Sequence, residues 1–199
     1  MIYLVYHDPG SDDSRLRLLV EGVGGVSLVR MSRLGEVGLG PGDTVALLMP
    51  MRGGHADEVR SLAASRGASW AGTIPTDVTA EAIARAATRL GCSSVRLYYW
   101  PAKRLRELQE EDLREIASRA SSLGVKAVLE GCADCIATMA LLPGRISLEA
   151  EAVARDCRAR SLGALVEFAA DSIVEWVKAL AARAGQELQA SDHIEGRVA

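Results

Sequence analysis

The sequence contains no asparagine and only three glutamines among its 199 residues. Depletion of these heat-labile amides is a trait of heat-adapted proteins, although a biased genome composition accounts for the sequence equally well. No apolar run approaches the roughly 20 residues that a membrane-spanning helix needs. Because the chain opens directly on an apolar strand pattern, we expect neither a signal peptide nor a transit peptide, and therefore a cytoplasmic location.

Charge of either sign is not in excess. Lysine and arginine number 23 and aspartate and glutamate 26, for a net charge of -3, and 49% of the residues are hydrophobic. This balance gives no support for a nucleic acid or a membrane surface as a partner. The length is sufficient for one large domain or two small ones with a substantial core. We expect a globular monomer or homodimer that acts on a small molecule.

Cysteine occurs only four times, at Cys92, Cys132, Cys135 and Cys157. Only Cys132-Ala-Asp-Cys135 has the spacing of metal ligands, and no second CxxC or CxxH completes a zinc set. The sequence therefore favours buried free thiols. A redox or metal role for Cys132 and Cys135 is the alternative.

Short apolar runs alternate with helix-like segments, which predicts an α/β fold. In the first half, strands are expected at residues 2–6, 26–30, 45–49 and 69–73, and helices from Ser11 or Ser14 to Val20, at 56–66 and from Thr76 or Thr79 to Leu90. Residues 31–43, rich in glycine, are expected to form a loop with at most one helical turn. This half is a complete four-strand unit.

The second half carries strand patterns at 95–99 and 125–129, and helix patterns at 103–122 and 170–184. Between them, residues 136–142 read as a strand, or residues 133–142 as a helix followed by a strand at 146–153. The second alternative is preferred, because a parallel crossover usually needs about a dozen residues and the first leaves only a few.

Two segments recur 93 positions apart: Leu97 to Pro101 resembles Leu4 to Asp8, and Ala140 to Pro143 resembles Leu47 to Pro50. A shared offset favours a duplication. We therefore expect two similar halves, each with a small parallel sheet flanked by helices, at residues 1–92 and 93–185. Residues 186–199 form a polar tail, and its His193 is not expected to be functional.

The other two histidines stand at the ends of two expected strands. His7 ends the first strand, and His55 follows the third after Pro50 and Gly53-Gly54. Because parallel strands bring their carboxyl ends to one edge, where open α/β sheets bind ligands, these imidazoles are expected to share a site. Neutral imidazole binds divalent transition metals and accepts protons near neutral pH. The alternative is two ordinary loop residues, each making one hydrogen bond.

At these residues the sequence resembles the class II chelatases of tetrapyrrole biosynthesis, of the sirohydrochlorin cobaltochelatase and ferrochelatase type. Their first strand ends in a motif like G-H-G-S, and their third is followed by P-x-x-x-x-G-G-H. Here the motifs read Tyr6-His7-Asp8-Pro9 and Pro50-Met-Arg-Gly-Gly-His55, and the resemblance covers roughly residues 1–100. It implies a chelatase-like fold whose halves are alike but of which only one keeps the histidines. Trp100 takes the place of His7 in the other.

The resemblance implies a chelatase that inserts cobalt or ferrous iron into sirohydrochlorin or a related tetrapyrrole. His7 and His55 would hold the metal and accept the pyrrole protons, without an organic cofactor. Sirohydrochlorin carries many carboxylates, which the planar fork of arginine binds well. The cationic residues expected to bind them are Arg52, Arg30, Arg33, Lys103 and Arg104.

The sequence also departs from the family pattern. Tyr6 and Asp8 stand where the family has glycines, and the second strand ends in Arg30 where the family often has an acidic residue. Glu36 lies nearby, and Glu130 holds a comparable place in the second half. Two rival functions follow: a non-catalytic metal- or tetrapyrrole-binding protein of this fold, and a thiol-based protein that uses the CxxC motif.

Overall fold

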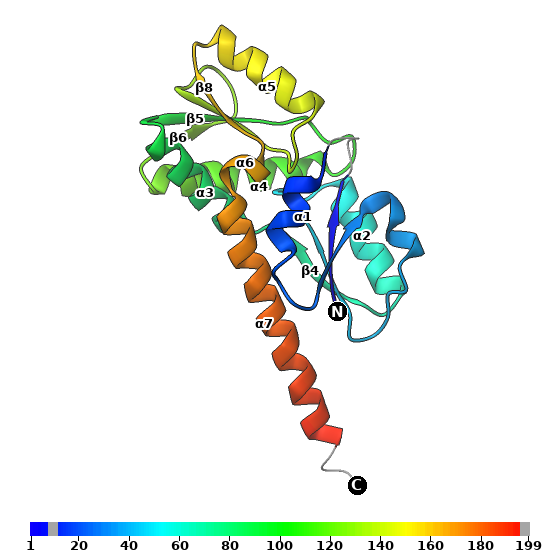
Figure 1. Ribbon diagram of the computed structural model, residues 1–199. Coiled ribbons are helices and arrows are strands. Elements are labelled where there is room, and N and C mark those ends of the chain that lie inside the picture. Colours follow the sequence, from blue (N-terminus) through cyan, green and yellow to red (C-terminus); the bar gives the residue numbers. More distant parts are fainter. Residues whose placement is uncertain (8–11, 196–199) are drawn as a thin grey trace.

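Two parallel sheets form the framework of the computed structural model, which describes residues 1–7 and 12–195 (Figure 1). The first has the order β2-β1-β3-β4 and the second β6-β5-β7-β8. The strands are β1 (Ile2–Tyr6), β2 (Val26–Arg30), β3 (Thr44–Leu47), β4 (Ser69–Thr73), β5 (Ser94–Tyr98), β6 (Lys126–Val128), β7 (Cys135–Thr138) and β8 (Arg160–Gly163). The predicted α/β fold of two similar halves is confirmed.

Helices connect and cover these strands. They are α1 (Ser14–Val20), the 3-10 helix η1 (Met31–Glu36), α2 (Gly54–Ser65), α3 (Thr76–Arg89), α4 (Arg106–Ser122), α5 (Arg145–Asp156), α6 (Leu165–Phe168) and α7 (Ala170–Glu195). The helix expected to end at Ala184 thus continues to Glu195. Within the described part of the chain, no helix is both long and apolar enough to cross a membrane.

The expected helix at 133–142 and strand at 146–153 are wrong: the structure has β7 and then α5 there. A strand of three residues such as β6 is only about 10 Å long. Six residues reach up to about 20 Å when extended, so residues 129–134 can return past so short a strand even with the bend at Gly131. β7 then pairs with the side of β5 opposite β6. A crossover connection of about a dozen residues is needed only when the chain must return along a longer strand. The short elements β8 and α6 were not expected.

The two sheets match in register as well as in order. Leu4 pairs with Ala46 in the first sheet, and Leu97 with Ala137 in the second. Each third strand then shows a register shift at the same place, between Val45 and Ala46 and between Ile136 and Ala137. The structure therefore supports the duplication that the sequence indicates.

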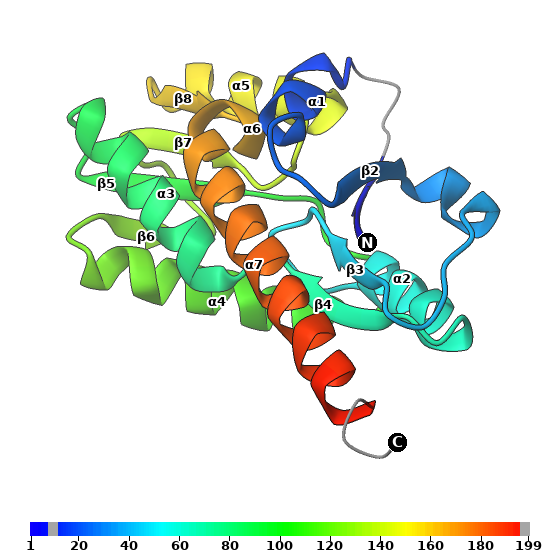
Figure 2. The ribbon, with the colours of Figure 1, turned by 60° about the horizontal axis from the view of Figure 1, so that its bottom comes forward.

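The two halves exchange helices. Although α3 completes the first half, its Ile83 and Ala87 pack in one core with Leu97 of the second sheet. In return, Ile173 and Val177 of α7 pack in one core with the first sheet. Figure 2 shows α7 running beside α3 toward β3 and β4. Neither half has a complete core without the other.

Residues that follow the third strands are exchanged in the same way. Met51, after β3, is buried in the core of the second sheet. Leu141 and Leu142, after β7, are buried in the core of the first sheet with Leu4 and Tyr6. Because both segments leave the carboxyl ends of their strands, the carboxyl edges of the two sheets face each other.

Candidate functional site

The structure brings His7 and His55 together at the carboxyl edge of the first sheet. Their ring centroids lie 4.8 Å apart, with 34° between the ring planes. His7 directly follows β1, and His55 is the second residue of α2. His7 is exposed, and the side chain of His55 is 46% exposed. Since bonds from imidazole to a transition metal are about 2 Å long, two rings at this separation are close enough to share one ion.

No carboxylate completes this pair as a closed metal site within the described residues. Glu58 Oε2 lies 3.9 Å from His55 Nδ1, on the same helix. Across residues 1–7 and 12–195, no group of three or more histidine, cysteine, aspartate or glutamate side chains is placed to hold a metal. Glu36 and Glu130 are both exposed and do not join the histidines. Within the described residues, the candidate metal site is therefore the pair of imidazoles without a third histidine, cysteine or carboxylate grouped with them.

A hydrogen-bonded cluster is centred on Asp13 and includes Tyr6, the residue directly before His7. The Tyr6 hydroxyl donates to Asp13, Arg17 donates to both of its oxygens at 3.0 and 2.9 Å, and Arg30 Nη2 donates to Oδ2 at 3.2 Å. These bonds, first from Arg17 and then from Tyr6, hold the pKa of Asp13 well below its usual range. Burial raises the pKa of Tyr6. The cluster fixes the start of α1 to the ends of β1 and β2.

Sequence reasoning missed Asp13, because a carboxylate outside any strand or helix pattern carries no local signal. Its partner Arg30 was expected to bind substrate. The Arg30 guanidinium instead lies against Asp13 and the Tyr6 hydroxyl, which accepts from Arg30 Nε at 3.1 Å. A contact between Arg30 and a substrate carboxylate stays a prediction.

Arg52 is likewise bound within the chain. Its Nη2 lies 2.6 Å from Asp112 Oδ1 and 2.9 Å from Glu111 Oε2, both on α4. The hydrogen bonds to Asp112 are the largest reason that the pKa of Arg52 is raised. Arg52 therefore joins the segment before α2 to the second half, and its role toward a substrate is untested.

The other three predicted cations are exposed. Arg33 lies on η1, and Lys103 and Arg104 precede α4. No carboxylate in the described part of the chain pairs with any of them. Arg104 is close to the histidines, since its Cβ lies 3.5 Å from where a Cβ on Gly54 would stand. These side chains are accessible to an anionic ligand, and their role in binding one stays a prediction.

The cysteines form two disulfides, Cys92–Cys135 and Cys132–Cys157, with Cα atoms 6.0 and 5.4 Å apart. The expectation of free thiols is therefore wrong. The alternative of a redox or metal pair within the CxxC motif is wrong too, because each of its cysteines is bonded to a cysteine outside it. Spacing along the chain could not reveal partners that only the folding of the second half brings together.

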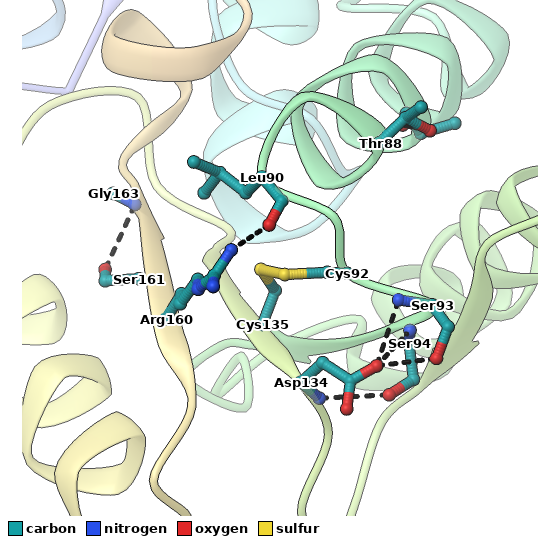
Figure 3. The surroundings of a disulfide bond; sticks show 11 residues. Thr88, Leu90, Cys92, Ser93, Ser94, Asp134, Cys135, Arg160, Ser161 and Gly163 are labelled. Atoms are coloured by element: carbon teal, nitrogen blue, oxygen red, sulfur yellow. Dashed lines mark hydrogen bonds between the residues drawn. A yellow bond between two sulfur atoms is a disulfide. The ribbon is translucent and has the colours of Figure 1, made fainter.

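Neither disulfide includes a residue of the first sheet: Cys92 lies between α3 and β5, and Cys132, Cys135 and Cys157 all lie in the second half. Figure 3 shows Cys92–Cys135 beside Asp134, whose Oδ2 accepts hydrogen bonds from the backbone N–H groups of Ser93 and Ser94 at 2.9 and 3.0 Å. The Ser93 hydroxyl donates to the same oxygen at 2.6 Å, and this bond, ahead of the backbone bonds, keeps the pKa of Asp134 below its usual value. These bonds hold the start of β5 against the start of β7, so this region is part of the framework.

Comparison with known proteins adds one informative likeness. No protein-family model and no curated protein matches the sequence. Among solved structures, "SirB from Bacillus subtilis with Fe3+" matches with a TM-score of 0.60 at 13% identity, over 93% of this chain and 97% of that chain. This likeness confirms the chelatase-like fold and shows the fold alone.

Two structures of arylmalonate decarboxylase also match, at 10% and 13% identity. The first match covers 86% of this chain and 90% of that one, with a TM-score of 0.36. The second, of the unliganded protein, covers 91% and 92%, with a TM-score of 0.32. Scores this low carry no argument about either fold or function.

Proposed function

We propose that this protein is a chelatase that inserts a divalent metal, cobalt or ferrous iron, into sirohydrochlorin or a related tetrapyrrole. The observation that carries the proposal is the pair of imidazoles, with ring centroids 4.8 Å apart at the carboxyl edge of the first sheet. The likeness of fold to SirB, whose structure holds Fe3+, supports it. So does the His55 motif of the sequence.

In this proposal the metal is a substrate. A resident structural metal usually has four protein ligands, whereas a site that keeps positions open admits another ligand. Two imidazoles leave such positions for the pyrrole nitrogens. As two bonds from pyrrole nitrogen to metal form, the bonds from imidazole to metal break and the macrocycle loses two N–H protons. His7 and His55, freed of the metal, accept those protons and pass them to water.

The exposed cations around the edge supply the means to hold the substrate. Arg33, Lys103 and Arg104 are exposed, and charge-assisted bonds to carboxylates are stronger than bonds between neutral groups. In the proposal these residues bind the peripheral carboxylates, while the reacting centre of the macrocycle faces the imidazoles.

The test is metal insertion followed in the visible spectrum, with sirohydrochlorin and either Co2+ or Fe2+. The protein should exceed the spontaneous rate. His7→Ala and His55→Ala should each lower the rate about 100-fold or more, as expected for loss of a group that takes protons. His193→Ala is the matched control and should leave the rate unchanged. Insertion that survives both active-site substitutions would overturn the proposal.

A second function is favoured by one observation. Because no third histidine, cysteine or carboxylate is grouped with the two histidines in the described residues, the protein would also suit a non-catalytic role in which it holds metal or tetrapyrrole. The same assay distinguishes the two. Tight binding of sirohydrochlorin, with no metal insertion above the spontaneous rate, would select this second function.

A further inference from the structure

The second half contains a structural counterpart of the histidine pair. The residue after β3 donates a backbone hydrogen bond to Val5, and the residue after β7 donates the same bond to Tyr98. Val5 and Tyr98 are therefore equivalent, and so are the residues two positions later, His7 and Trp100. The helices that follow, α2 and α5, both begin directly after an extended glycine, Gly53 or Gly144. The counterpart site thus consists of Trp100 and the first turn of α5.

This counterpart site contains no histidine pair; it is built from an indole, a carboxylate and a guanidinium. The indole N–H of Trp100 donates to Glu149 Oε2 at 2.7 Å, and the Tyr98 hydroxyl donates to the same oxygen at 3.2 Å. Arg145 Nε lies 3.4 Å from Glu149 Oε1, and its guanidinium carbon lies 5.6 Å from the Trp100 ring centroid. The Trp100 hydrogen bond is the first reason that the pKa of Glu149 is lowered. The indole is thus held in place by an ionised carboxylate and a stacked cation.

Trp100 remains 43% exposed despite these contacts. A large aromatic side chain that is oriented but only partly covered has apolar surface left to bury against a ligand. Arg145 is 82% exposed, so its guanidinium is accessible for a carboxylate. Together they offer a flat apolar surface beside a positive charge.

The counterpart lies close to the histidine pair. Gln109 fixes the segment after β5, since its Nε2 donates to the Trp100 carbonyl at 3.0 Å and its Oε1 accepts from the Ala102 N–H at 2.7 Å. The Cβ of Ala102 in turn lies 3.8 Å from where a Cβ on Gly53 would stand. Gly53 directly precedes the helix that carries His55. Both His7 and Trp100 lie just beyond the carboxyl end of the first strand of their sheet, and the carboxyl edges of the two sheets face each other.

We propose that Trp100 and Arg145 form a subsite that holds the substrate across from His7 and His55. This inference rests on the proposed function, and it assigns the second half a role in binding. The indole stacks on the conjugated pyrrole system, and Arg145 binds a peripheral carboxylate. The ligand class that fits is a flat, conjugated polycarboxylate. After the duplication, the first half binds the metal and accepts the protons, and the second half positions the macrocycle.

The experiment measures binding of metal-free sirohydrochlorin to the full chain by equilibrium dialysis, and insertion kinetics with Co2+. Trp100→Ala should raise Kd and KM about tenfold, which corresponds to about 1.4 kcal/mol, and change kcat less than twofold. Trp100→Phe retains an aromatic face and should recover most of the affinity. Arg145→Ala should raise Kd severalfold at low salt. The increase should be smaller at high salt, because salt screens the interaction between exposed charges. Arg155→Ala, on the last turn of the same helix, is the matched control and should have no effect.

Binding of Co2+ alone should be equal in all these variants, because the imidazoles are untouched. If the Trp100→Ala protein does not fold, Trp100→Leu keeps the apolar bulk but removes the aromatic face, and the same weakening is expected. Affinity within twofold of the original in a folded Trp100 variant would overturn the inference, even if insertion proceeds normally. Conversely, binding that depends on Trp100 without any insertion would support this subsite and overturn the proposed catalysis.

Discussion

Arg52 joins the two halves of the protein through the buried carboxylate of Asp112. Its backbone N–H donates to Asp112 Oδ2 at 2.5 Å, and its Nε donates to Oδ1 at 2.8 Å. Asp112 lies on α4 of the second half, and Arg52 lies three residues before His55. This contact therefore ties the segment before α2, which carries one of the two imidazoles, to the second half.

Replacing the buried Asp112 should lower the free energy of unfolding more than replacing an exposed carboxylate that contacts the same arginine. Asp112→Ala leaves a backbone donor and a guanidinium without a buried acceptor, which costs about 1–3 kcal/mol. Urea unfolding followed by circular dichroism measures the loss. Glu111→Ala is the matched control, because Glu111 contacts the same guanidinium but is 63% exposed, and an exposed ion pair contributes about 0–1 kcal/mol. Equal losses in the two variants would contradict the role given to Asp112.

The Asp13 cluster should make stability depend on pH in a defined direction. The hydrogen bonds of Arg17 and Tyr6 lower the pKa of Asp13 in the folded state, so the unfolded state binds a proton more readily. The resulting stabilisation is fully present above the ordinary aspartate pKa of about 3.9 and is lost as the pH falls toward the folded-state value. Asp13→Asn removes it. The difference in unfolding free energy between the original and this variant should be constant from pH 7 to 5 and shrink below about pH 4.

The exposed Asp156→Asn substitution is the control for this pH series. It should change the unfolding free energy by less than about 0.5 kcal/mol at every pH, as surface substitutions usually do. A difference for Asp13→Asn that grows on acidification would refute the role of the cluster.

The two disulfides should stabilise the protein against heat and denaturant. They close loops with sequence separations of 43 and 25 residues, and the chain-entropy relation gives about 3–4 kcal/mol for loops of this size. A reductant should therefore lower Tm. In a Cys132→Ser/Cys157→Ser variant, part of this sensitivity should disappear. Alkylation of all four cysteines in denaturant without reductant would show that the bonds do not form.

The exchange of helices predicts that neither half folds alone. A chain of residues 1–92 lacks α7, whose Ile173, Trp176 and Val177 cover the core of the first sheet. It should unfold without a cooperative transition and bind a hydrophobic dye. Mixing it under oxidising conditions with residues 93–199, which supply Cys135 as the disulfide partner of Cys92, should restore cooperative unfolding. A cooperative transition in residues 1–92 alone would contradict the shared core.

The sequence predicted much of the first half because its elements are locally encoded. The strands Ile2–Tyr6, Val26–Arg30 and Ser69–Thr73 have the expected bounds, since short apolar runs between turn residues are a local signal. In the second half the apolar stretch around Ile136 suited both a strand and a helix. Only the pairing of β7 with β5 and β8 decides between them.

Some features of the candidate site could be predicted from the sequence, and others could not. The positions of His7 and His55 at strand ends, and hence their convergence, follow from the parallel order of the strands, which the sequence determined. The cysteine pairs, the cluster around Asp13, the bond from Arg52 to Asp112 and the exchange of α3 and α7 were decided only by the tertiary structure. Each joins residues from different elements, and a contact of that kind leaves no period along the chain, because its partner is chosen by distance in space.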